Sequence, residues 1–317
     1  MEVHRPMLPD AHNYYLNRFA PTPLVPVRLE PGSPVIWVKL EFLNPSGSTK
    51  DRIAQHILVK AWRERRIGPG TTVIEASSGS TSIAMALACA QLGLRFIAVM
   101  PEGVSNERVL IIRAYGGEIR LTPRDEGILG SIAETGRIAK ECGGFLPRQF
   151  SNPENAEAHR LGTAREILAQ IPGETVDAVV TGVGTGGTLV GLYRGMCDGG
   201  CQAVPVLARP VNIRGACDVE CCSFSARIPG VVECVSTIFR EDDLPGLLTI
   251  EVEDEQAIET TRRLVCKGFP IGPSSGLNFQ AALEAARALG NPHARIVTVF
   301  PDRMERYFTT DLFRPFR

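Results

Sequence analysis

The chain has 317 residues, of which 44% are hydrophobic and 22% are charged, a composition typical of a globular protein with one large or two moderate domains. Its formal net charge of −1 argues against a general affinity for nucleic acid or anionic membranes. No apolar run approaches the roughly 20 residues of a membrane-spanning helix, and residues 1–10 lack the apolar centre of a signal peptide, so we expect a cytoplasmic protein.

The first half of the chain alternates strand-like and helix-like runs. The predicted strands are Ile36–Glu41, Thr72–Glu75, Arg95–Met100 and Glu118–Thr122. Helical periodicity follows the first three strands, beginning at Ile53, after Thr81 and after Ser105, which we expect to act as a helix cap. This order favours a parallel sheet covered by helices on both faces.

The second half repeats the alternation. Predicted strands are Asp177–Thr181, Val204–Ala208, Leu248–Val252 and Arg295–Phe300. Predicted helices run from about Asn155 to Gln170, after Thr188, from Asp254 to about Lys267, and after a turn at Pro270–Gly276. The cysteine-rich stretch 210–235 follows no regular pattern, and no linker is visible, so two α/β lobes with crossing chain segments are expected.

One lysine lies in a turn between a strand and a helix. The turn is Asn-Pro-Ser-Gly-Ser-Thr-Lys-Asp-Arg, residues 44–52, and it places Lys50 among hydroxyl and backbone donors. Lysine becomes nucleophilic when burial or a nearby cation lowers its pKa. Lys50 is therefore a candidate catalytic residue, although an isolated lysine at such a place is more often a solvated surface residue.

A glycine-rich turn, Gly182 to Thr188, connects another strand to a helix. Such a turn exposes backbone N–H groups at a helix N-terminus and suits a phosphate. It also fits the G-x-G-x-x-G pattern of dinucleotide sites, but the next strand ends at Ala208-Arg209-Pro210 without the acidic residue that this reading requires.

Two further hydroxyl-rich turns open helices. Residues 77–81, Ser-Ser-Gly-Ser-Thr, could bind an anion such as a carboxylate, and Ser274 lies in the other turn. Either turn alone could be simple helix capping. Because all these turns belong to α/β units, we expect them to meet in one crevice at the carboxyl edge of a sheet.

Nine cysteines, an odd number, suggest free thiols in a reducing compartment. Most of them fall in one stretch, at Cys197, Cys201, Cys217, Cys221, Cys222 and Cys234. These could be soft ligands for zinc or an iron–sulfur cluster, but their spacing matches no common zinc template. Free thiols are the preferred interpretation.

The motifs together resemble the cysteine synthase/cystathionine β-synthase family of pyridoxal-phosphate enzymes. The lysine turn matches the family motif almost letter for letter, and the resemblance spans nearly the whole chain. Matching segments include Thr22-Pro23-Leu24, Glu107-Arg108, Gln149-Phe150-Ser151-Asn152-Pro153, Gly184 to Thr188, Gly272 to Gly276 and Glu305-Arg306-Tyr307.

The resemblance implies a two-lobed, three-layer parallel-sheet fold of the tryptophan-synthase-β type, fold type II of these enzymes. It implies a small mobile lobe at about 47–152, a large cofactor-binding lobe formed by 1–46 and 153–317, and a homodimer.

The resemblance also implies roles for individual residues. Lys50 would carry pyridoxal 5′-phosphate as a Schiff base and later move protons, and Ser274 would meet the pyridine nitrogen. The cofactor phosphate would be held by Gly184, Thr185, Gly186, Gly187 and Thr188. The substrate carboxylate would be bound by Ser77, Ser78, Gly79, Thr81 and Gln149.

The implied reaction is β-replacement: an O-activated L-serine loses its β-substituent to give an aminoacrylate, which sulfide or a thiol then attacks. A neutral hydroxyl at the pyridine nitrogen would leave the ring a weaker electron sink and favour prompt loss of that substituent. The same residues could perform β-elimination, such as cysteine desulfhydration. A third hypothesis is a metal- or partner-sensing homologue that uses the cysteine cluster.

Two departures from the family bear on substrate and cofactor. Ser80 stands where the family usually has an asparagine that contacts the cofactor ring oxygen, so we expect that contact to be lost, weakened or bridged by water. Residues 209–235 replace a short loop that shapes the second-substrate pocket in the family.

Overall fold

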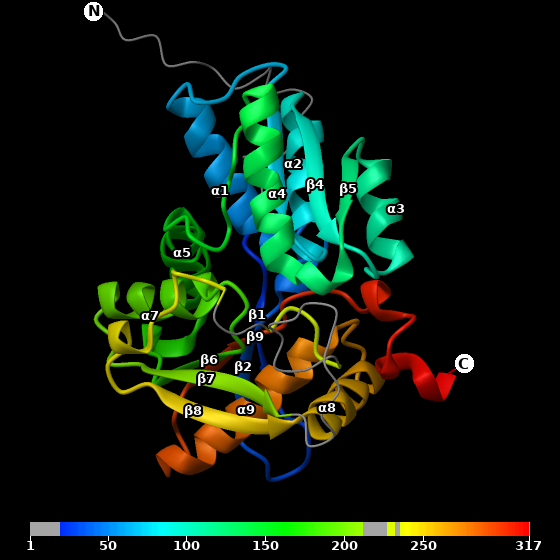
Figure 1. Cartoon of the computed structure of the whole chain (residues 1–317). Helices are drawn as coiled ribbons and strands as arrows, with labels where there is room; N and C mark the ends of the chain where they lie inside the picture. Colours follow the sequence, from blue (N-terminus) through cyan, green and yellow to red (C-terminus); the bar gives the residue numbers. More distant parts are fainter. Residues whose placement is uncertain (1–19, 212–226, 232–234, 317) are drawn as a thin grey trace, which may run out of the picture.

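A computed structural model describes residues 20–211, 227–231 and 235–316, and within these ranges it contains two β-sheets (Figure 1). The larger sheet has six strands in the order β1-β2-β9-β6-β7-β8, and the smaller has three in the order β3-β4-β5. Neighbouring strands run parallel except β1 and β2, which are antiparallel. The predicted two-lobed α/β class is confirmed.

The strands are β1 (Leu24–Val27), β2 (Ile36–Lys39), β3 (Thr72–Ala76), β4 (Arg95–Pro101), β5 (Glu118–Thr122), β6 (Ala178–Thr181), β7 (Val204–Val211), β8 (Leu248–Glu253) and β9 (Ile296–Val299). The α-helices are α1 (Lys50–Arg63), α2 (Ser80–Leu92), α3 (Asn106–Ala114), α4 (Gly127–Cys142), α5 (Glu154–Ala158), α6 (Ala164–Gln170), α7 (Gly187–Asp198), α8 (Asp254–Cys266) and α9 (Pro273–Leu289). A π-helix, His159–Thr163, joins α5 to α6, and a 3₁₀ helix covers Met304–Tyr307.

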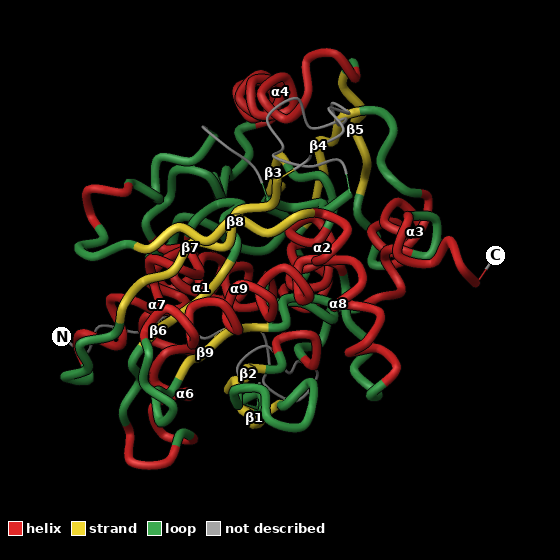
Figure 2. The backbone as a smooth tube through the Cα atoms, turned by 90° about the horizontal axis from the view of Figure 1, so that it is seen from below, coloured by secondary structure: helices red, strands yellow, loops and turns green. Residues whose placement is uncertain are grey.

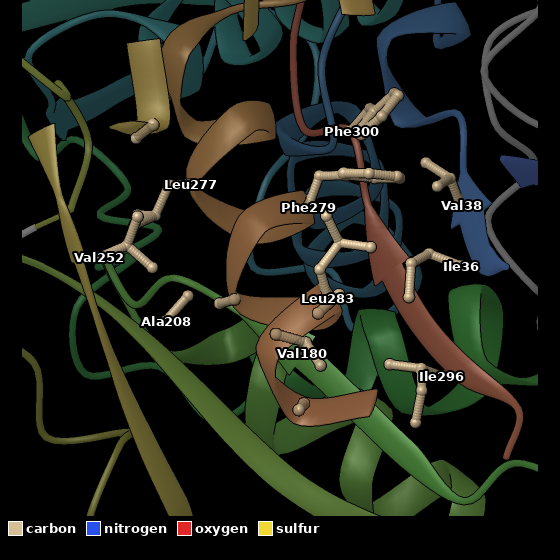
Figure 3. Close-up of a cluster of buried hydrophobic side chains, with 14 of the residues drawn as sticks. Ile36, Val38, Val180, Ala208, Val252, Leu277, Phe279, Leu283, Ile296 and Phe300 are labelled. Carbon is tan, nitrogen blue, oxygen red and sulfur yellow. The ribbon is translucent and has the colours of Figure 1, made fainter. Parts of the chain in front are cut away.

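Both faces of the larger sheet are buried, as expected for parallel strands flanked by helices. Val180 and Ile296 face α8 and α9, whereas the next residues, Val179 and Val297, pack with α6 and α7 on the other face. Figure 3 shows Phe279 of α9 in the cluster that also contains Val180 and Ile296. In Figure 2 the strands of this sheet curve around α9, which is therefore the central helix of the larger lobe.

The smaller sheet is also covered on both faces. Val73 and Phe96 pack with α1, α2 and α3, while Ile74 and Val99 contact Ile138 of α4. In Figure 1 this unit lies above the larger sheet.

Several elements differ from the prediction. Helix α4 covers a stretch to which no helix was assigned, and the predicted 155–170 helix is interrupted by the π-helix. Ser105 occupies the N-cap of α3 without a side-chain capping bond, and Ser274 lies within the first turn of α9 rather than in the preceding turn.

Elements α1–α4 and β3–β5 fall inside the range 47–152 expected for a small lobe. The limits of that lobe and its mobility stay predictions. Within the described ranges, no helix has the length and apolar character needed to cross a bilayer.

Candidate active site

The carboxyl ends of strands from both sheets open onto one cavity. β6 leads into the turn at 182–188, β3 into the turn at 77–81, and β9 into Pro301 and Asp302. The cavity contains about 1050 Å³ of empty space, including its solvent-filled mouth. The predicted residues that line it are Lys50, Ser77, Ser78, Ser80, Thr81, Gln149, Gly184, Thr185, Gly186, Thr188 and Ser274.

Lys50 is the first residue of α1 and lines the cavity. Burial lowers the pKa of its amine, and the charge of Arg306 lowers it further, while Asp302 and Glu41 raise it. Because burial has the largest effect, the neutral amine forms more readily than on a free lysine. Such an amine can attack a carbonyl group or accept a proton.

The turn before Lys50 is held from two sides. The carboxylate of Asp51 accepts hydrogen bonds from the Ser46 hydroxyl at 2.7 Å and from the backbone N–H groups of Ser46 and Ser48. Burial raises the pKa of Asp51 to about 6, although these hydrogen bonds act to lower it. Arg306 donates to the Gly47 carbonyl oxygen at 2.7 Å from the opposite side. Lys50 therefore projects from a fixed turn.

The glycine turn at 182–188 places donors at the N-terminus of α7. Gly186 has φ +79°, which favours glycine and lets the chain enter the helix directly. Among the described residues we find no acceptor for the backbone N–H groups of Gly186 and Thr188. Gly184 lies so close to the Gly230 carbonyl oxygen that a methyl group there would overlap with it. These donors fit the phosphate of the expected cofactor.

The turn at 77–81 presents a second set of donors at the N-terminus of α2. The Ser77 hydroxyl accepts from the Gly79 N–H at 3.0 Å and fixes the turn. Gly79 does not line the cavity; its Cα packs on Arg108, which donates to the Ser78 carbonyl oxygen at 2.9 Å. We find no acceptor in the described ranges for the Thr81 N–H, as expected for the first turn of a helix.

Gln149 connects this turn to the strand behind it. Its Oε1 accepts from the Thr81 hydroxyl at 2.6 Å, and its Nε2 donates to the Ala76 carbonyl oxygen at 2.6 Å. One hydrogen of Nε2 stays available to a ligand. Gln149 lines the cavity beside this turn, so the two predicted carboxylate-binding elements are brought together.

Ser80 is directed toward the segment after β9. Its hydroxyl donates to Oδ2 of Asp302 at 3.2 Å, and the Tyr307 hydroxyl donates to the same oxygen at 2.6 Å. The other carboxylate oxygen of Asp302 is buried and has no partner among the described residues. Burial and the neighbouring Asp302 charge raise the pKa of Tyr307, so its hydroxyl stays protonated.

Ser274 lines the cavity from the first turn of α9. One turn further along α9, Asn278 accepts from the Gly182 N–H at 2.7 Å and donates to the Val299 carbonyl oxygen at 3.0 Å. Asn278 thereby ties the ends of β6 and β9 together beneath the cavity and fixes the glycine turn relative to Ser274.

Four further residues line the cavity without a role predicted from the sequence: Asp302, Tyr307, Arg108 and Asn278. Asp302 follows a predicted strand, as the turns at 77–81 and 182–188 do, so its position could have indicated a site residue. Arg108 and Tyr307 belong to the matched motifs, but nothing in their spacing indicates that Arg108 lies over the Tyr307 ring, 5.7 Å from its centre.

The expected cysteine cluster is only partly described. Cys197 is exposed and Cys201 is buried, and both are free thiols. Cys217, Cys221, Cys222 and Cys234 lie outside the described residues. Within the described ranges, no group of three or more potential metal ligands occurs. Gly187, the remaining predicted phosphate residue, packs on Asn155 and does not line the cavity.

Comparison with known proteins identifies the family of the chain. Residues 16–302 match the family described as "Pyridoxal-phosphate dependent enzyme". A curated cysteine synthase from Staphylococcus aureus is 38% identical over 306 residues, covering 92% of this chain and 94% of the relative. The solved O-ureido-L-serine synthase is 32% identical, with a TM-score of 0.83 and 95% of each chain covered. A hydrogen sulfide-producing enzyme from Fusobacterium nucleatum is 35% identical, with a TM-score of 0.84 over 94% of this chain and 90% of that one. The chain therefore belongs to the family of pyridoxal-phosphate-dependent enzymes, in its cysteine synthase-like branch.

Proposed function

We propose that the protein catalyses β-replacement on an O-activated L-serine, with sulfide or a thiol as the nucleophile. The observation that carries the proposal is one cavity that holds a lysine of lowered pKa between two helix N-termini, each rich in donors. One terminus suits a phosphate, and the other suits the carboxylate of an amino acid. The relative named cysteine synthase and the structure named O-ureido-L-serine synthase support this choice of reaction.

Pyridoxal phosphate, when bound, supplies an aldehyde that condenses with an amine and a ring that withdraws electrons from Cα. Lys50 would hold this aldehyde. When the substrate amine takes the place of the Lys50 amine at this aldehyde, the freed Lys50 amine would be the base that takes the Cα proton. Burial supports this role because it favours the neutral, proton-accepting form of the amine.

The remaining residues of the cavity would bind and orient. The 184–188 turn would hold the phosphate, while Thr81 and Gln149 would bind the substrate carboxylate with the other residues of the 77–81 turn. Ser274 would meet the pyridine nitrogen with a hydroxyl, which is a weaker proton donor than a carboxylic acid. The ring would therefore withdraw electrons less strongly and favour early departure of the β-substituent.

Ser80 is too short to replace an asparagine directly. Its bond to Asp302 supports a different arrangement, in which the serine contacts the cofactor oxygen only through water or not at all. Closure of the 47–152 lobe would exclude water from the reacting carbon.

A second candidate is β-elimination that releases hydrogen sulfide from cysteine. The similarity to the hydrogen sulfide-producing enzyme favours it, because that structure covers nearly the whole chain. Both reactions would use the same residues and differ in the species that attacks or leaves at Cβ. We further propose a cytoplasmic homodimer, on the basis of the family resemblance and the free cysteines.

Absorption spectroscopy tests the proposal. The purified, cofactor-loaded protein should absorb visible light, and Lys50→Ala should lose this band. Titration with serine, acetylserine, phosphoserine and cysteine should identify the activated substrate by a spectral change. Product formed only with added sulfide or thiol supports replacement, whereas sulfide released from cysteine alone supports elimination. A colourless protein that ignores added cofactor refutes both.

A further inference from the structure

The 184–188 turn is backed by the helical segment α5–π–α6, which packs unusually closely on α7. Glycines recur at every fourth position on the facing side of α7, at Gly187, Gly191 and Gly195, and the C-cap, Gly199, continues the series. A methyl group at Gly187 would overlap with Oδ1 of Asn155, and one at Gly191 would overlap with the Ala156 carbonyl oxygen and the Cβ of His159. This close approach brings two polar side chains, Asn155 and His159, directly behind the turn.

Asn155 donates a hydrogen bond to a hydroxyl of the turn. Its Nδ2 lies 2.8 Å from the Gln149 carbonyl oxygen and 2.9 Å from Oγ1 of Thr185. A carbonyl oxygen can only accept, so the orientation of the amide is settled and Thr185 must accept as well. The Gly187 N–H also points at Oγ1 of Thr185, at 3.5 Å. Thr185 lines the cavity, and its own proton has no acceptor among the described residues.

His159 lies behind the second hydroxyl. Its Nδ1 is 3.0 Å from Oγ1 of Thr163, and its Nε2 is 3.3 Å from Oγ1 of Thr188. The ring is buried, and burial lowers its pKa to about 3, so at neutral pH one nitrogen carries a hydrogen and the other accepts. If Thr163 donates to Nδ1, then Nε2–H donates to Thr188, and the Thr188 proton is free to face the cavity.

The π-helix supports this placement. His159 is the first residue of the π-helix and Thr163 is the last. One wide helical turn therefore holds both residues of the hydrogen bond between Nδ1 of His159 and Oγ1 of Thr163. π-Helical turns inside α-helices are often found at functional sites. A phosphate dianion offers only acceptors, so a threonine that presented its lone pairs to the dianion would repel it.

We propose that Asn155 and His159 are positioning residues that hold Thr185 and Thr188 as hydrogen-bond donors to the cofactor phosphate, with His159 as the Nε2–H tautomer. The inference rests on the proposed assignment of the 184–188 turn to that phosphate. Neither residue touches the cofactor; each acts through the hydroxyl in front of it.

Binding to the full-length, cofactor-free protein tests the inference without measuring turnover. The matched ligands are pyridoxal phosphate and pyridoxal, which differ only in the phosphate, and inorganic phosphate is a third probe followed by ³¹P NMR. His159→Leu removes the donor, whereas His159→Gln keeps an amide N–H near the position of Nε2. Asn155→Asp turns the donor into an acceptor, and Asn155→Ala removes it without adding charge.

Loss of one hydrogen bond to a charged group costs about ten-fold or more in affinity. His159→Leu and Asn155→Ala should lower the affinity for pyridoxal phosphate by about this factor and change the affinity for pyridoxal by no more than about two-fold. Asn155→Asp should lower the affinity for pyridoxal phosphate further. His159→Gln should keep most of the native affinity. Thermal unfolding of each cofactor-free variant reports folding, and if Asn155→Asp does not fold, Asn155→Ala decides.

The inference would be overturned if the variants lost equal affinity for pyridoxal phosphate and pyridoxal, or lost affinity for neither. Thr185→Val and Thr188→Val separate this failure from that of the proposed function. If these two variants also leave the affinities for pyridoxal phosphate and inorganic phosphate unchanged, the assignment of the turn to the phosphate is itself wrong.

Discussion

Glu75 is a buried carboxyl group behind the 77–81 turn. Its two oxygens accept from the backbone N–H groups of Ala76 at 3.0 Å and Gln149 at 3.1 Å. Arg148 has φ +57°, which is rare outside glycine, and its N–H also points to this carboxyl group. Burial outweighs these bonds and raises the pKa of Glu75 to about 8. The group is therefore mostly protonated at neutral pH in the folded protein and ionised in the unfolded chain.

A group whose pKa is raised on folding stabilises the protein at low pH and loses that contribution as pH rises. Glu75→Gln should therefore flatten the decline in the free energy of unfolding between pH 5 and 8, where one proton changes the slope by up to about 1.4 kcal/mol per pH unit. Denaturant unfolding of the cofactor-free proteins at several pH values measures this slope. If the free energy of unfolding of the native protein and of Glu75→Gln changed with pH in parallel, the raised pKa of Glu75 would be contradicted.

Asp302 is the negative charge that acts most strongly on Lys50. Asp302→Asn should lower the pKa of the Lys50 amine further, because the carboxylate raises it in the native protein. Reductive methylation of Lys50 in the cofactor-free protein, followed by mass spectrometry, should then proceed at lower pH. Ser80→Ala is the matched control, since it removes the hydrogen bond to Asp302 but keeps the charge. An unchanged pH profile for Asp302→Asn would count against this electrostatic role.

The glycine face of α7 gives a prediction about an element. Gly191→Ala forces a methyl group against α5 and the π-helix, so we expect it to destabilise the protein by about 1–3 kcal/mol. Gly136→Ala in α4 is the control, because its added methyl group has no atom within 4 Å apart from its chain neighbours and the backbone of α4 itself, and alanine favours helix by about 1 kcal/mol. The midpoint temperature of thermal unfolding should fall for Gly191→Ala and rise for Gly136→Ala, each relative to the native protein. Equal effects would show that α7 and the π-helix can move apart.

Most strands and helices were predictable because alternation and apolar periodicity are local properties. The buried runs Thr72–Ala76 and Ala178–Thr181, for example, end at the turns that the sequence indicated. Helix α4 was missed because three glycines, Gly127, Gly130 and Gly136, obscure its pattern. The π-helix depends on packing against α7, which no local pattern of the 155–170 segment reports.

The predicted site residues came together because parallel strands align their carboxyl ends. The residues that the prediction missed act across the fold. Asn155 reaches the glycine turn from another helix, and Tyr307 reaches Ser80 through Asp302. These contacts depend on the relative placement of elements distant in sequence.

A largely buried network of charges connects α1, β2 and α6. Arg52, two residues after Lys50, bonds Glu41 at 2.7 Å and Glu166 of α6 at 2.6 Å, and Lys39 of β2 pairs with Glu166 at 2.8 Å. Burial alone would raise the pKa of Glu41, but Arg52 lowers it to about 2. The network joins α1 to β2 of the larger sheet and to α6.

Glu41→Gln should destabilise the whole protein by about 3–5 kcal/mol at pH 7, because Glu166 is then the single carboxylate beside Arg52 and Lys39 in this network, and one buried positive charge is not neutralised. Glu41 stabilises the folded state above its unfolded pKa of about 4.5 and loses this contribution as pH falls toward 2. The difference between the two proteins in denaturant unfolding should therefore narrow below pH 4.5. Glu64→Gln, in an exposed ion pair, is the control, with an expected change below about 1 kcal/mol. A Glu41→Gln effect no larger than this control would exclude a stabilising network.

The order of the larger sheet has a consequence for biosynthesis. β9 follows the other described strands in the chain, yet it pairs with β2 on one side and β6 on the other. Before β9 has left the ribosome, the nascent chain can complete β3-β4-β5, but the two halves of the six-stranded sheet have no strand between them. Acquisition of the vitamin B6 coenzyme must therefore wait until β9 has been made and has inserted between β2 and β6.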